Sequence, residues 1–282
     1  MRLNPFNTDN IQVRGSSGGG VGKAGGLGCG TIIIAALGYF VFGLDPFQTA
    51  ATVESVQQGT QSGGGTELSE EEACTASEYA REACDGLQSL NQTWSRVFQE
   101  QGFGDRFQQP TLFLYSGGVR TACGSGSSSM GPFYCPGDQT IYIDTSFYDQ
   151  LARMAGGGGD FARYYVLAHE YGHHIQTLTG VAGQIRSAQQ QNSRAANQLQ
   201  VRMELQADCY AGVWAGKNRN LIEPGDIEEG MQAAAAIGDD ALTGGRVSSE
   251  NFTHGTSAQR SEALRLGLRG NDLACDEYTN VR

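Results

Sequence analysis

Three of the four histidines in this chain of 282 residues lie within one run of six, HEYGHH at 169–174. His169 and His173 are four residues apart, and on a helix this spacing lets two imidazoles converge on one metal ion. Glu170 lies beside them and can reach a water molecule at the metal without being a ligand itself. Composition alone would produce H-E-x-x-H in roughly three such chains in a thousand, so chance is a poor explanation.

A catalytic zinc site has three protein ligands and an open position, so a third ligand is expected on another element. The stretch 201–216, VRMELQADCYAGVWAG, has apolar rows at helical spacing that Glu204 and Asp208 interrupt. Buried carboxylates are costly without a cation or a donor nearby. We therefore predict Glu204 as the third zinc ligand and Asp208 as the acceptor for the free ring N–H of a ligating histidine. The two acids could exchange these roles, and a solvent-facing acid pair is the alternative.

The element that carries the histidines can be predicted from its ends. The segment 159–180 reads as one helix, with Asp160 as the N-cap and Gly180 as the stop. A strand-like stretch at 139–147 precedes this helix. Such a strand either pairs with an extended substrate by edge addition or is a plain core strand.

The remaining histidine, His254, lies in FTHGTSAQR, just before a predicted helix start at Thr256 or Ser257. Peptide hydrolysis needs a donor for the oxyanion of the tetrahedral intermediate, and His254 is our candidate. A loop or capping role for His254 is the alternative, and tyrosines compete for the oxyanion role.

The motifs together resemble the bacterial neutral zinc metallopeptidase family, which carries H-E-x-x-H on one helix and E-x-x-x-D on a second. HEYGHH and ELQADCYAGVWA match this pattern, and ACGSGSSSMGPFYCPGDQTIYID and FTHGTSAQR are similar to the family as well. The resemblance covers about residues 110–277. It implies an α+β zincin-like fold in which His169, His173 and Glu204 bind one zinc ion and Glu170 is the catalytic acid/base. The Gln-rich segment 184–200 matches less well, and no role is transferred to it.

An apolar run suggests a membrane anchor. Between Lys23 and Asp45 lie 21 uncharged residues, enough for a helix to cross a hydrocarbon core of roughly 30 Å. Basic residues precede this run, so the N-terminus is expected in the cytoplasm and the catalytic domain in the periplasm or outside the cell. The expected organisation is a cytoplasmic tail at 1–23, a single transmembrane helix at 24–44, a flexible stalk at 45–69 and a zinc metallopeptidase domain at 70–282.

Six cysteines follow the expected anchor, and an even number in an exported region suggests three disulfides. Short loop closure favours the first two of these pairs: Cys74 with Cys84, Cys123 with Cys135, and Cys209 with Cys275. Zinc ligation by these cysteines is the rival interpretation, but the chain has no C-x-x-C knuckle.

The net charge of −11 and the pI near 4.8 provide no basic field for nucleic acid, which we exclude as a partner. The sequence therefore predicts a membrane-anchored peptidase with one Zn²⁺ per chain, acting on a peptide or protein substrate. In it a zinc-bound water attacks the peptide bond with Glu170 as general acid/base. The alternatives are a non-catalytic zinc-containing binding or scaffold module of the cell envelope and a soluble cytosolic hydrolase.

Overall fold

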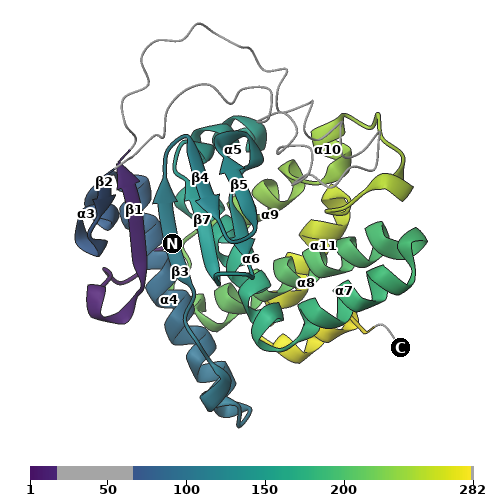
Figure 1. Cartoon of the computed structure of the whole chain (residues 1–282), viewed down its shortest axis with the longest axis horizontal. Coiled ribbons are helices and arrows are strands. Elements are labelled where there is room, and N and C mark those ends of the chain that lie inside the picture. Colours follow the sequence, from purple (N-terminus) through teal and green to yellow (C-terminus); the bar gives the residue numbers. More distant parts are fainter. Residues whose placement is uncertain (18–65, 281–282) are drawn as a thin grey trace, which may run out of the picture.

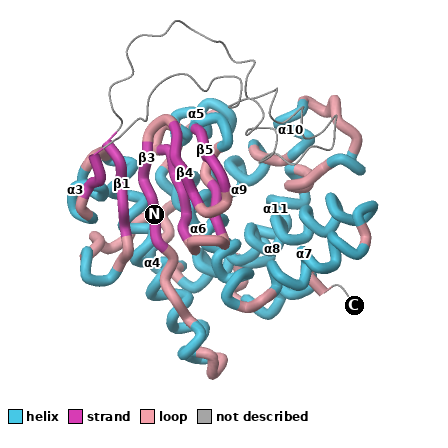
Figure 2. Tube along the Cα trace, in the orientation of Figure 1, coloured by secondary structure: helices cyan, strands magenta, loops and turns pink. Residues whose placement is uncertain are grey.

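The computed structural model describes residues 1–17 and 66–280, and these form an α+β structure, the expected class. Figures 1 and 2 show a sheet on one side of the molecule and a group of packed helices on the other. The main sheet has five strands in the order β2-β1-β3-β7-β6. Their bounds are β1 Val13–Ser17, β2 Thr66–Leu68, β3 Thr111–Tyr115, β6 Phe133–Cys135 and β7 Thr140–Asp144. A separate hairpin joins β4 Gly118–Thr121 to β5 Gly124–Ser127.

The middle of the main sheet is parallel and its two edges are antiparallel. β1 pairs with β3 and β3 with β7 in parallel, whereas β2 and β6 run antiparallel to their neighbours. All five residues of β7 are buried, and β3 and β6 occupy both of its edges. Of the two alternatives for this strand, the structure supports the plain core strand, because β7 has no free edge for an extended substrate.

Helices supply most of the remaining structure. The longest are α4 Glu78–Glu100, α6 Asp160–Leu178 and α8 Ala196–Lys217. The others are α3 Glu70–Thr75, α5 Phe147–Ala155, α7 Val181–Gln191, α9 Asp226–Ala236, α10 Asp239–Thr243 and α11 Ser257–Gly267. Short 3₁₀ turns cover Thr8–Asn10, Gly104–Arg106, Ser128–Met130, Ser193–Ala195, Arg219–Leu221, Ser249–Asn251 and Asp272–Glu277.

The predicted histidine helix is α6, and it is the central element of the core. It packs against α4, α8 and α9, and most of its residues are buried. The N-cap lies one residue before the predicted one: Gly159 is the N-cap, and Asp160 is the first helical residue. The Asp160 carboxylate binds the amino group of Met1 at 2.9 Å. Gly180, with φ of 81°, follows the helix in the left-handed conformation and ends it as predicted.

Helices α8 and α11 approach so closely that only glycine fits between them. A Cβ atom at Gly212 would lie 2.2 Å from the carbonyl oxygen of Leu264, and one at Gly267 would lie 1.9 Å from that of Cys209. At α11, Thr256 and Gln259 form a capping box, which confirms the helix start predicted there. The close packing of α8 against α11 fixes the position of the loop before α11 relative to α8.

The six cysteines form three disulfides, with the pairing that loop length favoured: Cys74–Cys84, Cys123–Cys135 and Cys209–Cys275. Zinc ligation by these cysteines is therefore excluded, because zinc binds the cysteine thiolate and the sulfurs here are in disulfides.

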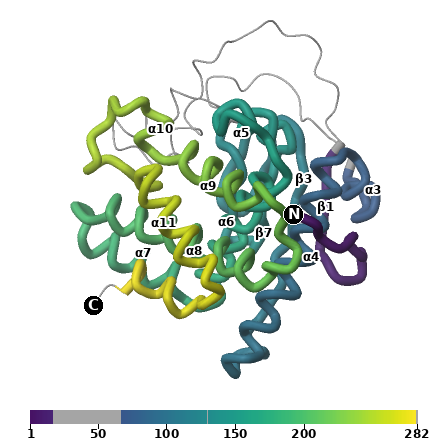
Figure 3. The backbone as a smooth tube through the Cα atoms, turned by 180° about the vertical axis from the view of Figure 1, so that it is seen from behind, coloured from purple at the N-terminus to yellow at the C-terminus, as the bar shows by residue number. Residues whose placement is uncertain are grey.

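The expected single-pass membrane anchor is wrong. Residues 24–44 lie outside the described part of the chain, and no helix within the described part is long and apolar enough to cross a membrane. The N-terminal segment instead forms β1, which pairs with β2 on one side and β3 on the other. Figure 3 shows β1 beside β3. A single crossing at 24–44 would put β1 and the catalytic domain on opposite sides of a bilayer, whereas here they share one sheet.

Candidate metal centre

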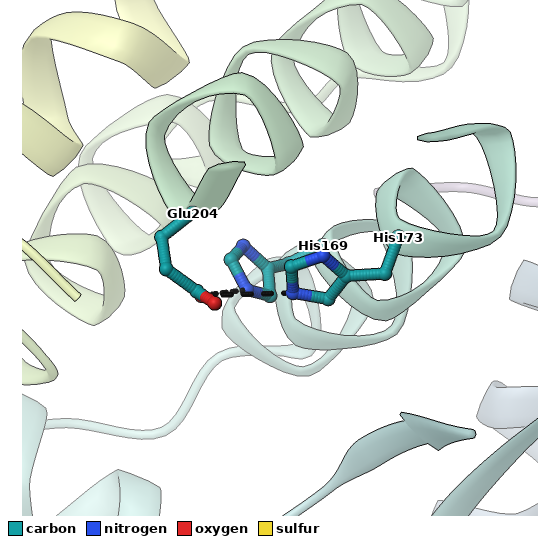
Figure 4. A group of neighbouring side chains, drawn as sticks. All are labelled: His169, His173 and Glu204. Carbon is teal, nitrogen blue, oxygen red and sulfur yellow. Dashed lines mark hydrogen bonds and ion pairs between the residues drawn. The ribbon is translucent and has the colours of Figure 1, made fainter. Parts of the chain in front are cut away.

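The crossing of α6 and α8 brings together the three predicted zinc ligands (Figure 4). His169 Nε2 lies 3.1 Å from Glu204 Oε2, and His173 Nε2 lies 3.6 Å from the same oxygen. The donor atoms of His169, His173 and Glu204 all lie within 4.8 Å of one another. His169 and Glu204 are buried, and His173 is partly exposed. The group therefore combines a compact donor set with one accessible side.

Hydrogen bonds orient both imidazoles for metal binding. His169 Nδ1 lies 2.7 Å from Asp208 Oδ1, and His173 Nδ1 lies 2.9 Å from Gln176 Oε1. The Gln176 amide nitrogen donates to Met203 O, so its oxygen is the atom that faces His173. Both Nδ1 atoms thus face acceptors and carry hydrogen, which leaves the Nε2 lone pairs of the neutral rings directed at Glu204. Two imidazole nitrogens and one carboxylate oxygen fit zinc.

Charge within the group also favours a cation. Burial acts to raise the pKa of Glu204, but His173 and His169 outweigh it and hold the pKa well below its ordinary value. Burial acts to lower the pKa of His169, but Asp208 and Glu204 raise it to about 10. Without a metal the group therefore holds a proton in place of the cation, and metal binding must displace it.

Asp208 contacts the candidate ligand His169 and not the candidate metal position, which is the arrangement that its predicted role requires. Two buried residues hold Asp208 in place. Tyr165 Oη donates to Asp208 Oδ1 at 2.6 Å, and Arg260 donates to both carboxylate oxygens at 2.8 and 2.9 Å. Burial acts to raise the pKa of Asp208, but the charges of Arg260 and His169 lower it to about 2. A charged Asp208 keeps the hydrogen on His169 Nδ1.

The sequence prediction missed Arg260 and Tyr165. The only sequence signal for them was indirect: Asp208 in an apolar helix required a cation or donor, and FTHGTSAQR supplied an arginine without a role.

The metal group opens into a cavity of about 820 Å³. Glu170 lines it next to the donor atoms, and so does His254 from the loop before α11. Residues 130–137 and α5 form an apolar wall, with Phe133, Tyr134, Phe147 and Met154 among its side chains. A segment of peptide chain with its side chains fits a cavity of this size.

A buried carboxylate orients His254. Asp239 Oδ2 accepts the backbone N–H groups of Thr253, His254 and Gly255 at 2.8, 2.7 and 3.0 Å. Its other oxygen, Oδ1, lies 3.2 Å from His254 Nδ1. Since a carboxylate only accepts, Nδ1 carries hydrogen and Nε2 is the nitrogen left for a group in the cavity. The structure thus brings all the predicted site residues to one cavity or to its immediate support, while their catalytic roles stay predictions.

Two uncharacterized bacterial proteins are similar to this chain. The chain is 42% identical over 287 residues to the uncharacterized protein YpfJ of Escherichia coli strain K12, covering 96% of each chain. It is 44% identical over 190 residues to the uncharacterized protein Rv2575 of Mycobacterium tuberculosis strain H37Rv, covering 61% of this chain and 64% of the relative. No solved structure matches. The family model described as "Putative neutral zinc metallopeptidase" matches residues 4–278. The chain therefore belongs to the neutral zinc metallopeptidase family, the family that its histidine and glutamate motifs resemble.

Proposed function

We propose that this protein is a zinc-dependent peptidase that holds one zinc ion per chain through His169, His173 and Glu204. The observation that carries the proposal is the convergence of His169 Nε2, His173 Nε2 and Glu204 Oε2 within 4.8 Å, in a cavity that Glu170 also lines. A purely structural zinc site usually has four protein ligands and no adjacent acid, so three ligands beside a free carboxylate favour catalysis.

Bound zinc would supply Lewis-acid polarisation of the scissile carbonyl and a lowered pKa for water in the site. Glu170 accepts the proton of the attacking water and delivers it to the leaving amine. Asp239 orients the ring of His254. When this ring is protonated, its Nε2 donates a hydrogen bond to the substrate oxygen on which negative charge develops. Asp208 and Gln176 hold the rings of His169 and His173 with their Nε2 atoms toward Glu204.

The test combines metal content with hydrolysis. Purified protein is analysed for zinc by plasma mass spectrometry and assayed on casein and on quenched fluorescent peptides, beside Glu170→Gln and Glu204→Ala. We expect about one zinc per chain in the parent and in Glu170→Gln, and its loss in Glu204→Ala. Hydrolysis should fall by about 10² to 10⁴ in Glu170→Gln.

The matched control is Glu262→Gln, an exposed glutamate on α11, which should change neither zinc content nor hydrolysis. The parent could instead bind zinc and hydrolyse no substrate, with Glu170→Gln changing none of its properties. This result would identify a non-catalytic zinc module. Stoichiometric zinc in Glu204→Ala would reject the ligand set.

A further inference from the structure

The cavity has an unusual charge distribution for so acidic a chain. The protein has 30 Asp and Glu against 19 Lys and Arg. Among the described residues that line the cavity, however, the only acids are Glu170 and Glu204, both already assigned to the metal centre. The wall formed by residues 130–137 and α5 carries no charged side chain into it. Outside the metal centre, the described residues thus bring no negative charge to the cavity.

Helix α7 places a positive charge in this space. Ala182, Arg186 and Gln189 recur at spacings of four and three residues, and all three line the cavity, so one face of α7 is directed into it. Ile185, fully buried on the neighbouring face, anchors the helix, which packs against α6 and α8. The Gln-rich segment thus forms a wall of the candidate active site.

Arg186 differs from the other arginine of the cavity because it has no acidic partner. Arg260 is buried and paired with Asp208, whereas Arg186 is exposed and forms no ion pair within the described part of the chain. The neighbouring Gln189 amide is already engaged by Ala196 O and Gln200. Arg186 is therefore the free cationic group of this wall.

We propose that Arg186 binds a carboxylate of the substrate, so that the protein selects peptides with an acidic group on the α7 side of the scissile bond. This inference rests on the proposed peptidase function. A guanidinium recognises a carboxylate by paired, charge-assisted hydrogen bonds. The carboxylate is either an Asp or Glu side chain or the C-terminal carboxylate of the peptide, and both offer the same chemistry.

The test measures binding separately from cleavage. The full chain carrying Glu170→Gln is loaded with zinc, and its affinity is measured by fluorescence anisotropy for labelled heptapeptides based on Gly-Ala-Phe-Leu-Ala-Ala-Gly. One residue at a time is replaced with Glu, and a matched set carries Gln. Each peptide is made with a free and with an amidated C-terminus. A side-chain preference and a terminal-carboxylate preference are thereby distinguished.

We expect at least one Glu position, or the free C-terminus, to bind more tightly than its neutral match by up to about fivefold, the upper end for an exposed charge pair. Arg186→Gln should abolish this preference and Arg186→Glu should reverse it. Arg194→Glu is the charge-matched control, since Arg194 is exposed in the same segment but does not line the cavity. That variant should keep the preference.

Equal binding of every Glu and Gln pair and of both C-termini would overturn the inference, as would a preference that survives Arg186→Glu. The same peptides are then given to the zinc-loaded parent. Selective binding without cleavage would contradict the peptidase function and leave the recognition intact. Cleavage of the peptides without a preference for acidic ones in binding would support the peptidase function and reject the role of Arg186.

Discussion

Arg260 binds both carboxylate oxygens of Asp208, with Nε 2.8 Å from Oδ2 and Nη2 2.9 Å from Oδ1. Both side chains are almost completely buried. The same carboxylate receives His169 Nδ1 at 2.7 Å, so the orientation of a candidate zinc ligand depends on this ion pair. The pair joins α6, α8 and α11 at one point.

Replacing Arg260 with Ala should destabilise the protein by about 3–5 kcal/mol, because Asp208 would stay buried without its cation. Denaturant unfolding measures this loss. Arg260→Lys should recover only part of the stability, since an ammonium cannot reproduce the paired contact. Arg265→Ala removes an exposed arginine of the same helix and should cost less than about 1 kcal/mol. Equal effects of the two Ala variants would contradict the role assigned to Arg260.

Gln200 contacts the carboxylate of Glu204, the third candidate zinc ligand. Gln200 donates to Glu204 Oε1 at 2.8 Å, while Glu204 Oε2 faces the two histidines. Gln200 thereby holds Glu204 so that one oxygen is available for zinc. Gln200→Ala should weaken zinc binding by about tenfold, the lower end for loss of such a supporting residue. Chelator competition measures the affinity, and exposed Gln198→Ala should leave it unchanged.

The candidate zinc ligands could be predicted from the sequence. The spacing of the two histidines and the energetic cost of a buried carboxylate are both local properties of the chain. H-E-x-x-H at 169–173 places two imidazoles on one helix face, and acids within the apolar pattern of α8 require a cation or donor. Asp208 was assigned by the same argument, and the structure places it against His169.

The partners of these residues could not be predicted, because they depend on which elements pack together. Arg260 reaches Asp208 only through the crossing of α8 and α11, and Arg186 faces the cavity only through the position of α7. The membrane anchor failed for a related reason. Hydropathy described residues 24–44 alone, whereas the pairing of β1 with β2 and β3 depends on strands far along the chain.

The orientation of His254 predicts coupled effects on catalysis. His254→Ala should lower kcat by about 10²-fold, with little change in KM, if its ring stabilises the developing oxyanion. Asp239→Asn presents an amide to His254 Nδ1 and should lower kcat in the parent but cost little more in the His254→Ala background. Zinc content should be unchanged in all three variants. If the Asp239→Asn loss is the same in both backgrounds, Asp239 is only a loop anchor.

The close contact of the two ligand helices predicts a strong effect at Gly172. A Cβ atom there would lie 2.9 Å from Ala207 Cα and 3.0 Å from its carbonyl oxygen. Gly172→Ala should therefore force α6 and α8 apart, destabilise the protein by about 1–3 kcal/mol and weaken zinc binding. Gly183→Ala is the matched control, because no atom lies within 4 Å of its Cβ position on α7. It should be neutral or stabilise by up to about 1 kcal/mol, and a similar loss in both variants would contradict the argument.

Asp144 predicts a pH-dependent contribution to stability. It lies at the end of β7 and accepts hydrogen bonds from Gly117 N, Ser146 N and Ser128 Oγ, which tie the sheet to the segment before the apolar wall. Burial acts to raise the pKa of Asp144, but these hydrogen bonds outweigh it and hold the pKa below its ordinary value of 3.8. Because the folded-state pKa is depressed, the stabilisation is present above pH 3.8 and is lost as the pH falls through the folded-state pKa.

Asp144→Ala should therefore destabilise the protein by about 2–3 kcal/mol near pH 7, because three partly buried hydrogen bonds to a charged acceptor are lost. The difference between parent and variant should stay constant down to about pH 5 and shrink at lower pH. Urea unfolding at a series of pH values measures both effects. Asp105→Ala, at an exposed position, should show neither. A difference that persists unchanged below the folded-state pKa would mean that Asp144 acts through packing. Protonation removes the charge and turns one carboxyl oxygen into a donor, so the hydrogen bonds that Asp144 accepts should weaken.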